Sequence, residues 1–260
     1  MIKGLYTAYT GMINEQHRMD VLTNNLANAD TNGFKKEGAT SQSFDSMLAY
    51  KLRDISEGDR RMAKRIGMNN PGVKIGEGYT DFSEGPMKVT GNPFDLALTD
   101  RGFFAVEFTN KAGETSVKYT RDGNFTLTQD GRLVTQDGDP VLDESGQPIE
   151  IDPLQQAEIN TSGQIVQDGR VVATIQVADF EDYNYLERFG ENYFQPIEGA
   201  RELDEVEAQV YSGYLETSNI SMVSEMVNMI TVSRAYETNQ KVITTYDSTL
   251  DIAVNQLGKI

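Results

Sequence analysis

Few side chains in this sequence could do chemistry, and none of them forms a recognisable catalytic set. The 260 residues include no cysteine and one histidine, His17, so thiolate nucleophiles, disulfides and Cys-based metal sites are excluded. His17 lies beside heptad positions of a predicted helix, where we expect a surface imidazole rather than a general base. With 40 acidic residues, chance carboxylate pairs are common and a glycosidase dyad cannot be argued. No enzymatic activity is predicted.

A metal or phosphate site is also not supported by the residue spacing. A short acidic group resembles a calcium loop at first sight: Asp137, Asp139, Asp143 and Glu144. The EF-hand pattern fails, because Val141 stands at its third ligand position and Leu142 at its glycine position. The glycines of residues 72–78 match neither a dinucleotide-binding fingerprint nor a P-loop. We therefore predict no cofactor and attribute the aspartates to turns.

The charge is strongly acidic and unevenly distributed. The formal net charge is −17. From Asp139 to Glu207 there are 17 acidic and 3 basic residues, which argues against nucleic acid or an anionic membrane as a partner. The simplest interpretation is a solvated acidic face. The sequence has no apolar run long enough to cross a membrane, and its first residues lack the pattern of a cleaved secretory signal.

The C-terminal region carries the strongest pattern in the chain. From Tyr214 to Leu257 there is no Gly or Pro, and apolar residues recur every seven positions: Met222, Met229, Tyr236, Ile243, Leu250 and Leu257. Others fill the intermediate offsets: Met226, Val232, Tyr246, Ala253 and Val254. This spacing predicts one long amphipathic helix. The span from Met222 to Leu257 would be roughly 54 Å long. This exceeds the roughly 47 Å diameter of a compact globule of this size, which indicates an elongated assembly.

The N-terminal region carries a second heptad, formed by Leu5, Met12, Met19 and Leu26. All seven prolines lie between positions 71 and 196, so the two ends are predicted to be helical and the middle not. The first helix should stop near Asp30–Gly33, with Gly33 able to take φ > 0. Gly4 and Gly11 each weaken that helix by about 1 kcal/mol relative to Ala, although Gly11 could allow close backbone approach. We expect the two heptads to pair as a coiled coil.

Residues 35–80 are predicted to form an extended connector, in which SFDSMLAYKL offers only a short amphipathic turn or two. Its basic cluster is either a solvated face or a docking patch for an acidic neighbouring subunit: Arg60, Arg61, Lys64 and Arg65.

From residue 81 the sequence has the pattern of β-structure. Two alternating apolar runs flank Asp100–Gly102, and RVVATIQVADF is predicted to be a buried strand. Turn dipeptides occur every 7–10 residues: 122–123, 130–131, 137–138, 145–146, 162–163 and 168–169. This rhythm suits an antiparallel barrel or sandwich.

Asn219 and Ser221 are the candidate N-caps of the C-terminal helix. The predicted class is α+β, with an all-β domain inserted between terminal helices. The expected domains are an N-terminal helix (1–34), the connector (35–80), a β domain (81–213) and a C-terminal helix (214–260).

Three ordered motifs resemble the axial proteins of the bacterial flagellum, specifically the rod and hook family. They are LTNNLANADTNGFKK (22–36), YTRDGNFTLTQDGRLVT (119–135) and GYLETSNISMVSEMVNMITVSRAYETNQKVI (213–243). Together they span essentially the whole chain. The length, the GYLETSN segment and the YTRDGNF segment favour the distal-rod group. The two chain ends are about as similar to the proximal-rod group.

The resemblance implies a non-enzymatic subunit that is exported through the flagellar type III channel without a cleaved signal. Such subunits polymerise into a tube between the membrane motor and the hook, with terminal helices inside and the β domain outside. The partners would be other copies, neighbouring rod and hook subunits and the export apparatus. The subunit-interface residues would be Leu5, Met12, Met19, Asn24, Asn25, Leu26, Asn28, Met222, Met229, Tyr236, Ile243, Leu250 and Leu257. For the three asparagines, a plain polar helix face is the alternative. A discrete coiled-coil oligomer presenting a β binding domain is the second hypothesis for the whole chain.

Overall fold

The computed structural model describes residues 2–52, 63–111, 113–190, 192–203, 206 and 208–257. The chain forms two compact units. Unit 1 comprises Met1–Leu26, Glu37–Thr80 and Met222–Ile260, and unit 2 comprises Ala27–Lys36 and Asp81–Ser221. The chain therefore passes between the units four times. The fold is mixed α+β, and its strand pairs are mostly antiparallel, as expected from the sequence.

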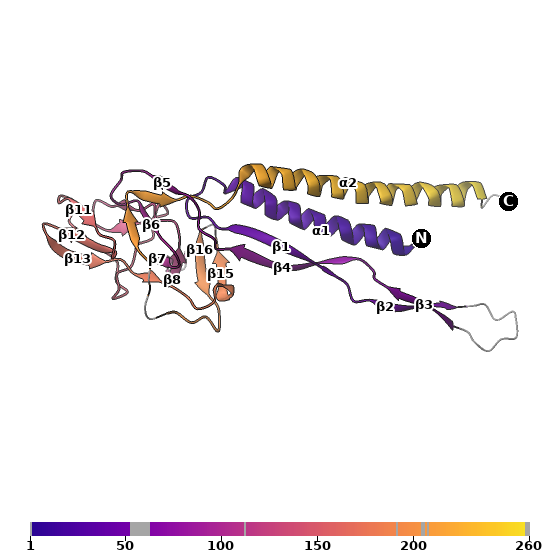
Figure 1. Ribbon diagram of the computed structural model, residues 1–260, viewed down its shortest axis with the longest axis horizontal. Coiled ribbons are helices and arrows are strands. Elements are labelled where there is room, and N and C mark those ends of the chain that lie inside the picture. Colours follow the sequence, from indigo (N-terminus) through magenta and orange to yellow (C-terminus); the bar gives the residue numbers. More distant parts are fainter. Residues whose placement is uncertain are drawn as a thin grey trace. The chain divides into compact units, whose positions relative to one another are not determined.

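Unit 1 consists of two long helices and a two-stranded ribbon (Figure 1). The helices are α1 (Ile2–Ala27) and α2 (Met222–Ile252), and α2 continues into the π-helical turn η2 (Ala253–Leu257). The ribbon strands are β1 (Lys36–Ser43), β2 (Met47–Leu52), β3 (Ala63–Asn69) and β4 (Val73–Asp81). β1 pairs with β4 and β2 with β3. Both chain ends are helical, as the proline distribution predicted.

The amphipathic turn predicted within SFDSMLAYKL is wrong. Residues Met47–Leu52 form a strand that pairs antiparallel with β3, from Met47 opposite Asn69 to Leu52 opposite Ala63. The backbone groups of β2 are satisfied by a partner more than ten residues away in sequence, which local periodicity cannot reveal. Of the predicted basic cluster, Arg60 and Arg61 lie outside the described residues, as do the side chains of Lys64 and Arg65, so the docking-patch hypothesis stays a prediction.

Local chemistry sets the end of α1, and strand pairing sets the start of α2. α1 ends at Ala27, and Gly33 adopts φ 67°, as expected for the turn that follows the helix. α2 begins at Met222, directly after the candidate N-cap Ser221. The first residues of the predicted 214–260 segment do not join the helix, because Tyr214–Glu216 forms strand β18 against β5. The β18 residues satisfy their backbone groups in a sheet and are unavailable to extend the helix.

Unit 2 contains the remaining strands and one 3₁₀ turn. They are β5 (Met87–Val89), β6 (Leu96–Leu98), β7 (Phe103–Thr109), β8 (Thr115–Thr120), β9 (Thr126–Leu127), β10 (Leu133–Val134), β11 (Ala157–Ile159), β12 (Gln164–Gln167), β13 (Arg170–Thr174), β14 (Val177–Ala178), η1 (Tyr183–Tyr185), β15 (Leu186–Phe189), β16 (Tyr193–Pro196), β17 (Val210–Ser212) and β18 (Tyr214–Glu216). The largest sheet has the order β14-β7-β8-β16-β15. Smaller sheets pair β17 with β6, β18 with β5 and β10 with β9, and β11-β12-β13 forms a separate sheet.

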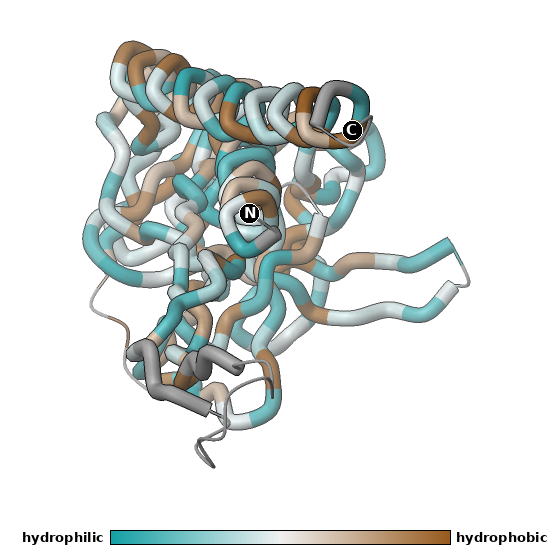
Figure 2. Tube along the Cα trace, turned by 90° about the vertical axis from the view of Figure 1, so that its right-hand side faces the viewer, coloured by the Kyte–Doolittle hydropathy of each residue, from teal (hydrophilic) through white to brown (hydrophobic). Residues whose placement is uncertain are grey.

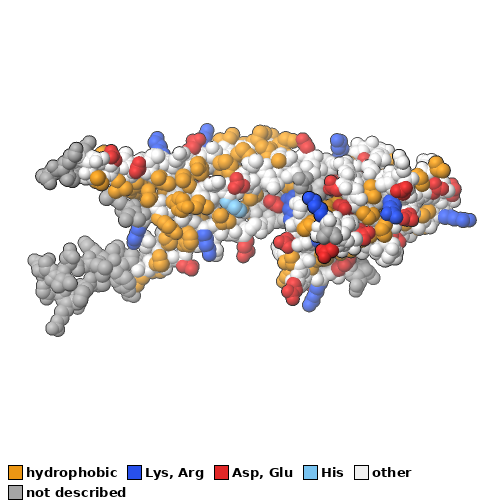
Figure 3. All heavy atoms as spheres, turned by 180° about the vertical axis from the view of Figure 1, so that it is seen from behind, with side chains coloured by type: hydrophobic (Ala, Val, Ile, Leu, Met, Phe, Trp, Pro, Cys, Tyr) orange, Lys and Arg blue, Asp and Glu red, His pale blue; other side chains and the backbone are white. Residues whose placement is uncertain are grey.

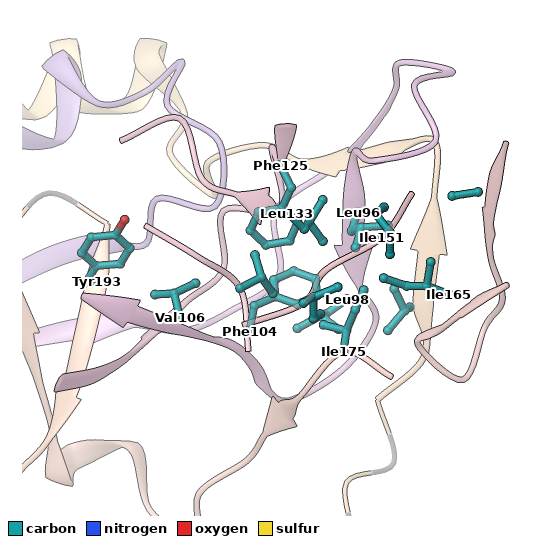
Figure 4. Packing of buried hydrophobic residues seen from close by; sticks show 14 residues of the cluster. Leu96, Leu98, Phe104, Val106, Phe125, Leu133, Ile151, Ile165, Ile175 and Tyr193 are labelled. Atoms are coloured by element: carbon teal, nitrogen blue, oxygen red, sulfur yellow. The ribbon is translucent and has the colours of Figure 1, made fainter. Parts of the chain in front are cut away.

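β7 is covered on both faces and divides the core of unit 2. Phe104 and Val106 join one hydrophobic cluster, which includes Leu96, Phe125 and Ile165 (Figure 4). The alternate residues Phe103 and Ala105 join a second cluster with Tyr119, Phe180 and Phe194. Successive strand side chains point to opposite faces, so the unbroken apolar run at 103–106 follows from two-sided burial.

Two turn predictions illustrate what spacing can and cannot show. Asp168 and Gly169 have φ 49° and 76° and connect β12 and β13 as a two-residue hairpin, which confirms that turn. Asp122–Gly123 is not a hairpin turn, because β8 and β9 do not pair with each other. There, the Gly123 carbonyl accepts a hydrogen bond from Leu96 N at 2.9 Å, and a Cβ on Gly123 would overlap the Leu96 carbonyl.

The single buried strand predicted for RVVATIQVADF is wrong. It divides into β13, whose Val171 is 55% exposed, and β14, which pairs with β7 in the large sheet. The chain changes sheets at Ile175 and Gln176, so the two halves face different surroundings.

Candidate assembly surfaces and a buried ion cluster

The two helices of unit 1 meet at glycines of α1. A Cβ on Gly4 would lie 2.5 Å from the Tyr246 hydroxyl oxygen, and one on Gly11 would lie 3.0 Å from the Asn239 Nδ2. Moving seven residues forward along α1 thus moves seven residues backward along α2, so the helices are antiparallel neighbours (Figure 1). The sequence suggested close backbone approach at Gly11, whereas the atoms that approach it are those of the Asn239 side chain.

The contact line of α2 lies three residues after each predicted heptad position. Tyr246 and Asn239 touch α1, and the same spacing continues to Val232 and Glu225, the two buried side chains of α2. The predicted series Met222, Met229, Tyr236 and Ile243 therefore flanks the line that contacts α1. Because a helix advances about 100° per residue, a shift of three residues moves the face by about 60°.

The ribbon packs on another face of α1. The Thr7 hydroxyl donates to the Pro71 carbonyl at 3.2 Å, and a Cβ on Gly72, whose φ is 140°, would overlap the Thr10 hydroxyl. Near the other end of α1, Asn25 Nδ2 donates to the Glu37 carbonyl at 2.8 Å, and Asn25 Oδ1 accepts from Glu37 N at 2.9 Å. Within unit 1, α1 thus has α2 on one side and the ribbon on another.

The predicted interface residues differ in their exposure. Seven apolar residues are half-buried: Leu5, Met12, Met19, Leu26, Met229, Tyr236 and Ile243. Met222 and Leu250 are 41% and 43% exposed, and the side chain of Leu257 lies outside the described residues.

The three predicted asparagines also differ in their exposure and in the unit to which they belong. Asn24 is exposed, and Asn28 lies in unit 2, where its Oδ1 accepts from the Thr31 hydroxyl at 3.3 Å. Asn25 is fully buried, and both ends of its amide bond to Glu37. Within the chain, strand β1 thus occupies both ends of the Asn25 amide, and the intersubunit role of Asn25 stays a prediction.

Large apolar side chains on the helices remain exposed in two stripes. The α1 stripe is Tyr6, Tyr9 and Ile13, and the α2 stripe is Val223, Met226, Val227 and Ile230. Hydrophobic residues recur along the helices in the hydropathy view (Figure 2) and gather on the surface of unit 1 (Figure 3). Monomeric soluble proteins rarely expose contiguous apolar stripes of this kind, so the stripes mark candidate interaction surfaces.

Unit 2 contains a buried cluster of three charged side chains, here called the junction cluster: Lys35, Arg121 and Glu216. Lys35 Nζ lies 2.6 Å from Glu216 Oε1, and Arg121 Nη1 lies 3.4 Å from Glu216 Oε2. All three side chains are at most 2% exposed. Removing charges from water is costly, and a buried carboxylate between two cations is retained only when its oxygens are well paired.

Backbone groups complete the junction cluster. Glu216 Oε1 also accepts from Gly85 N at 2.9 Å, while Lys35 Nζ and Arg121 Nη2 donate to the carbonyls of Ser83 and Asp100 at 2.8 and 2.5 Å. Burial lowers the pKa of the Lys35 ammonium, and the Glu216 carboxylate opposes that shift. We treat Lys35 and Glu216 as an ionised pair, because the 2.6 Å contact between them is typical of a charge-assisted hydrogen bond.

The junction cluster ties together the segments by which the chain enters and leaves unit 2. Gly33 N donates to the Glu216 carbonyl at 2.8 Å, and Asn219 Oδ1 accepts from Lys36 N at 2.9 Å. Asn219 Nδ2 donates to the Asp81 carbonyl at 2.9 Å. Asn219, considered as a helix cap, instead joins these segments.

Sequence reasoning did not select these charged residues, because Lys, Arg and Glu are usually exposed. The sequence nevertheless contained one signal that pointed to these three residues. Each of the three motifs that carried the family resemblance contributes one member of the cluster: Lys35 comes from 22–36, Arg121 from 119–135 and Glu216 from 213–243.

The structure describes both sites that were considered for chemistry, His17 and the acidic group. His17 is partly exposed on α1. Asp143 accepts from Thr174 N at 2.9 Å and from the Ser145 hydroxyl at 3.0 Å, and Asp139 accepts from the Tyr193 hydroxyl at 2.7 Å. These bonds agree with the turn role proposed for the acidic group. Across the described part of the chain, no group of three His, Asp or Glu side chains is placed to hold a metal ion, and no helix there is long and apolar enough to cross a membrane.

Three family models match the chain in order. Residues 5–35 match "Flagella basal body rod protein", residues 97–173 match "Flagellar hook protein FlgE/F/G D1 domain" and residues 211–257 match "Flagellar basal body rod FlgEFG protein C-terminal". Curated relatives include the flagellar hook-basal body complex protein FlhO of Bacillus subtilis, which is 32% identical with full coverage of both chains. The flagellar basal-body rod protein FlgF of Caulobacter vibrioides is 33% identical, again with full coverage of both. A flagellar basal-body rod protein FlgG of Buchnera aphidicola is 34% identical over 96% of this chain and 98% of its own.

Proposed function

The chain belongs to the flagellar basal-body rod family, and on that premise we propose how it works as a structural subunit of the rod. Its copies polymerise through the helices of unit 1 into the tubular shaft that joins the membrane motor to the hook. The observation that supports this proposal most directly is the exposed α2 stripe, where Val223 is 69% and Ile230 is 54% exposed. Covering these side chains contributes roughly 1.5–3 kcal/mol each when burial is complete.

The two apolar stripes lie at different heights along the helix pair. In the antiparallel pair, Gly4 faces Tyr246 and Gly11 faces Asn239, so the middle of the α1 stripe lies opposite α2 residues near 240. The middle of the α2 stripe lies about 14 residues away, or roughly 21 Å along the helix. The two stripes are therefore offset within one copy, and a second copy displaced along the helices by this distance brings them together. We propose this head-to-tail arrangement, which leaves one stripe free at each end and propagates, rather than a two-fold dimer, in which both stripes would be paired.

The predicted heptads extend this surface. On α1, Leu5, Met12, Met19 and Leu26 flank the intrachain contact, and on α2 so do Met222, Met229, Tyr236, Ile243 and Leu250. Leu257, whose side chain lies outside the described residues, continues the same heptad in the sequence. We propose that helices of neighbouring copies cover them with coiled-coil-like packing. Asn24 remains a candidate for polar contacts between copies, and Asn28 for contacts made from unit 2.

The remaining partners follow from the same role. We propose that the chain contacts neighbouring rod and hook subunits, leaves the cytoplasm through the flagellar export apparatus without a cleaved signal, and resides in the rod where it crosses the periplasm and cell wall. A distal position is our working assignment, because GYLETSN and YTRDGNF resemble the distal-rod group. Cross-linking in isolated basal bodies tests this position: adducts with hook-side components support it, whereas adducts only with the motor-side ring contradict it.

The test of polymerisation replaces Val223 and Ile230 with Lys. Both positions are exposed, so the purified subunit should keep its circular dichroism and unfolding midpoint, while cells should lose swimming and basal bodies should end before the point of insertion. Thr238→Lys adds the same charge at an exposed polar position of α2 and should leave motility within about twofold of wild type. Ile243→Asp and Leu250→Asp test the flanking heptad in the same assay.

Swimming cells that carry Val223→Lys and Ile230→Lys would contradict the surface assignment. A discrete coiled-coil oligomer is the alternative. It predicts a single small stoichiometry by sedimentation at every concentration, and no incorporation into basal bodies.

A further inference from the structure

The junction cluster links three parts of unit 2 that are far apart in sequence. Lys35 and Glu216 are separated by 181 residues, and Arg121 and Glu216 by 95. During chain growth, both cations are present long before the carboxylate that pairs them. If unit 2 closed without Glu216, two cations would be buried beside each other with no anion among the three members of the cluster. An uncompensated buried charge is strongly destabilising.

Hydrogen bonds to the backbone also connect Glu216 and Asn219 to the other segments of unit 2. The Glu216 carbonyl holds Gly33, its carboxylate holds Gly85, and Asn219 holds Lys36 and Ser83. Residues 215–219 are thus the shared partner of both other segments at which the chain enters or leaves unit 2. They immediately precede α2, which carries the exposed apolar stripe.

We propose that the junction cluster makes folding of unit 2 conditional on the segment that leads into α2: unit 2 closes only after Leu215–Asn219 have arrived and Glu216 has paired with both cations. A chain that ends before this segment therefore does not present a finished β unit. This role is independent of the polymerisation proposed above, because it concerns the isolated chain.

The first experiment uses the full-length protein. Glu216→Gln keeps the side-chain shape and removes the charge, and it should lower the folding equilibrium constant of unit 2 on the order of 10²- to 10³-fold in urea titration. Glu150→Gln is the matched control, because Glu150 pairs with Arg132 at 3.1 Å with both side chains more than half exposed. Loss of that exposed pair should change the folding equilibrium constant by less than about fivefold.

The second experiment separates a requirement for Leu215–Asn219 from plain stabilisation. The double substitution Lys35→Met and Arg121→Met is made in the full chain and in a chain that stops after Gly213, where folding itself is the readout. In the full chain, it leaves the Glu216 carboxylate buried without either cation of the cluster and should lower the folding constant at least tenfold. In the shortened chain, it removes two unpaired cations and should raise amide protection in β7 and β8 at least tenfold.

A change of sign between the two chains is therefore the expected result. The proposal is overturned if the double substitution has the same sign in both chains, or no effect in the shortened one. It is also overturned if the unsubstituted shortened chain already shows the β7 protection of the full-length protein, or if Glu216→Gln costs no more than Glu150→Gln.

Discussion

At the scale of single residues, Gly33 shows how closely the N-terminal segment approaches the middle of the chain. Its φ is 67°, and a Cβ there would overlap the Arg121 carbonyl group and lie 2.5 Å from Asp122 N. Both obstacles are backbone atoms, so no rotamer change relieves them. Glycine at this position is required by the close approach as well as by the turn.

We therefore predict that Gly33→Ala destabilises unit 2 by about 3 kcal/mol or more, because left-handed strain and overlap with backbone add. Gly146→Ala is the control, since Gly146 has φ 73° with no atom within 4 Å of the added Cβ. This control substitution should lower the free energy of unfolding by only about 1 kcal/mol. Urea unfolding followed by tyrosine fluorescence measures both, and equal costs would show that backbone approach does not matter at Gly33.

Asp122, the neighbour of Arg121, gives a prediction about pH. Burial raises the pKa of its carboxyl to about 6, against the ordinary 3.8. The folded state therefore binds this proton more tightly than the unfolded chain does. The resulting contribution to stability is complete below about pH 4 and is lost as the pH rises through about 6.

Replacing Asp122 with Asn should therefore raise stability at pH 7 by up to about 3 kcal/mol, since one pKa unit corresponds to about 1.4 kcal/mol. The Asn oxygen can still accept from Asn124 N, as Asp122 does at 3.0 Å. Unfolding midpoints of the variant and of the exposed control Asp130→Asn, measured from pH 4 to 8, test this. A parallel pH dependence in wild type and Asp122→Asn would contradict it.

At the scale of elements, the pairing of α1 with α2 is set by small residues on one helix and polar ones on the other. Gly4 and Gly11 admit Tyr246 and Asn239, and the strongly apolar heptads flank this line. The helix pair thus uses a partly polar seam within the subunit and keeps apolar side chains available at its edges. This arrangement agrees with helices that need further partners.

The contact at Gly11 can be tested with two substitutions that add side chains of increasing size at this position. Gly11→Ala should be neutral or stabilising, because the gain in helix propensity of up to about 1 kcal/mol is set against a 3.0 Å approach to the movable Asn239 amide. Gly11→Leu has no room and should separate the helices, so that amide protection falls in both α1 and α2 by hydrogen exchange. Unchanged protection in Gly11→Leu would mean that the helices do not pair there in solution.

At the scale of the whole molecule, the two units differ in how much apolar surface they bury. Both hydrophobic clusters, which include Phe103, Phe104 and Phe194, lie in unit 2. In the described part of unit 1, the buried hydrophobic side chains are Ala8 and Val232. Because amphipathic helices obtain their stability from packing, unit 1 should depend on partners.

We therefore expect the isolated subunit to exchange the amides of α1 and α2 at least a hundredfold faster than those of β7, with the difference reduced in assembled rods. Hydrogen exchange followed by mass spectrometry on dilute protein and on isolated basal bodies measures this. Helices as strongly protected as β7 in the dilute subunit would contradict the dependence of unit 1 on assembly.

The sequence alone determined the features that depend on local chemistry. Proline placement and heptads located both helices, Asp168–Gly169 located a hairpin, and three motifs identified the family. These signals are readable because helix periodicity and turn conformations depend on residues a few positions apart.

Only the tertiary structure decided which distant residues meet. It placed Met47–Leu52 in a strand, gave the Asn25 amide to Glu37, and buried Lys35, Arg121 and Glu216 together. In the sequence these three charges look like surface residues, since Lys, Arg and Glu are usually exposed. Their burial is possible because contacts across 95 and 181 residues supply the opposite charge, and no local pattern records such a contact.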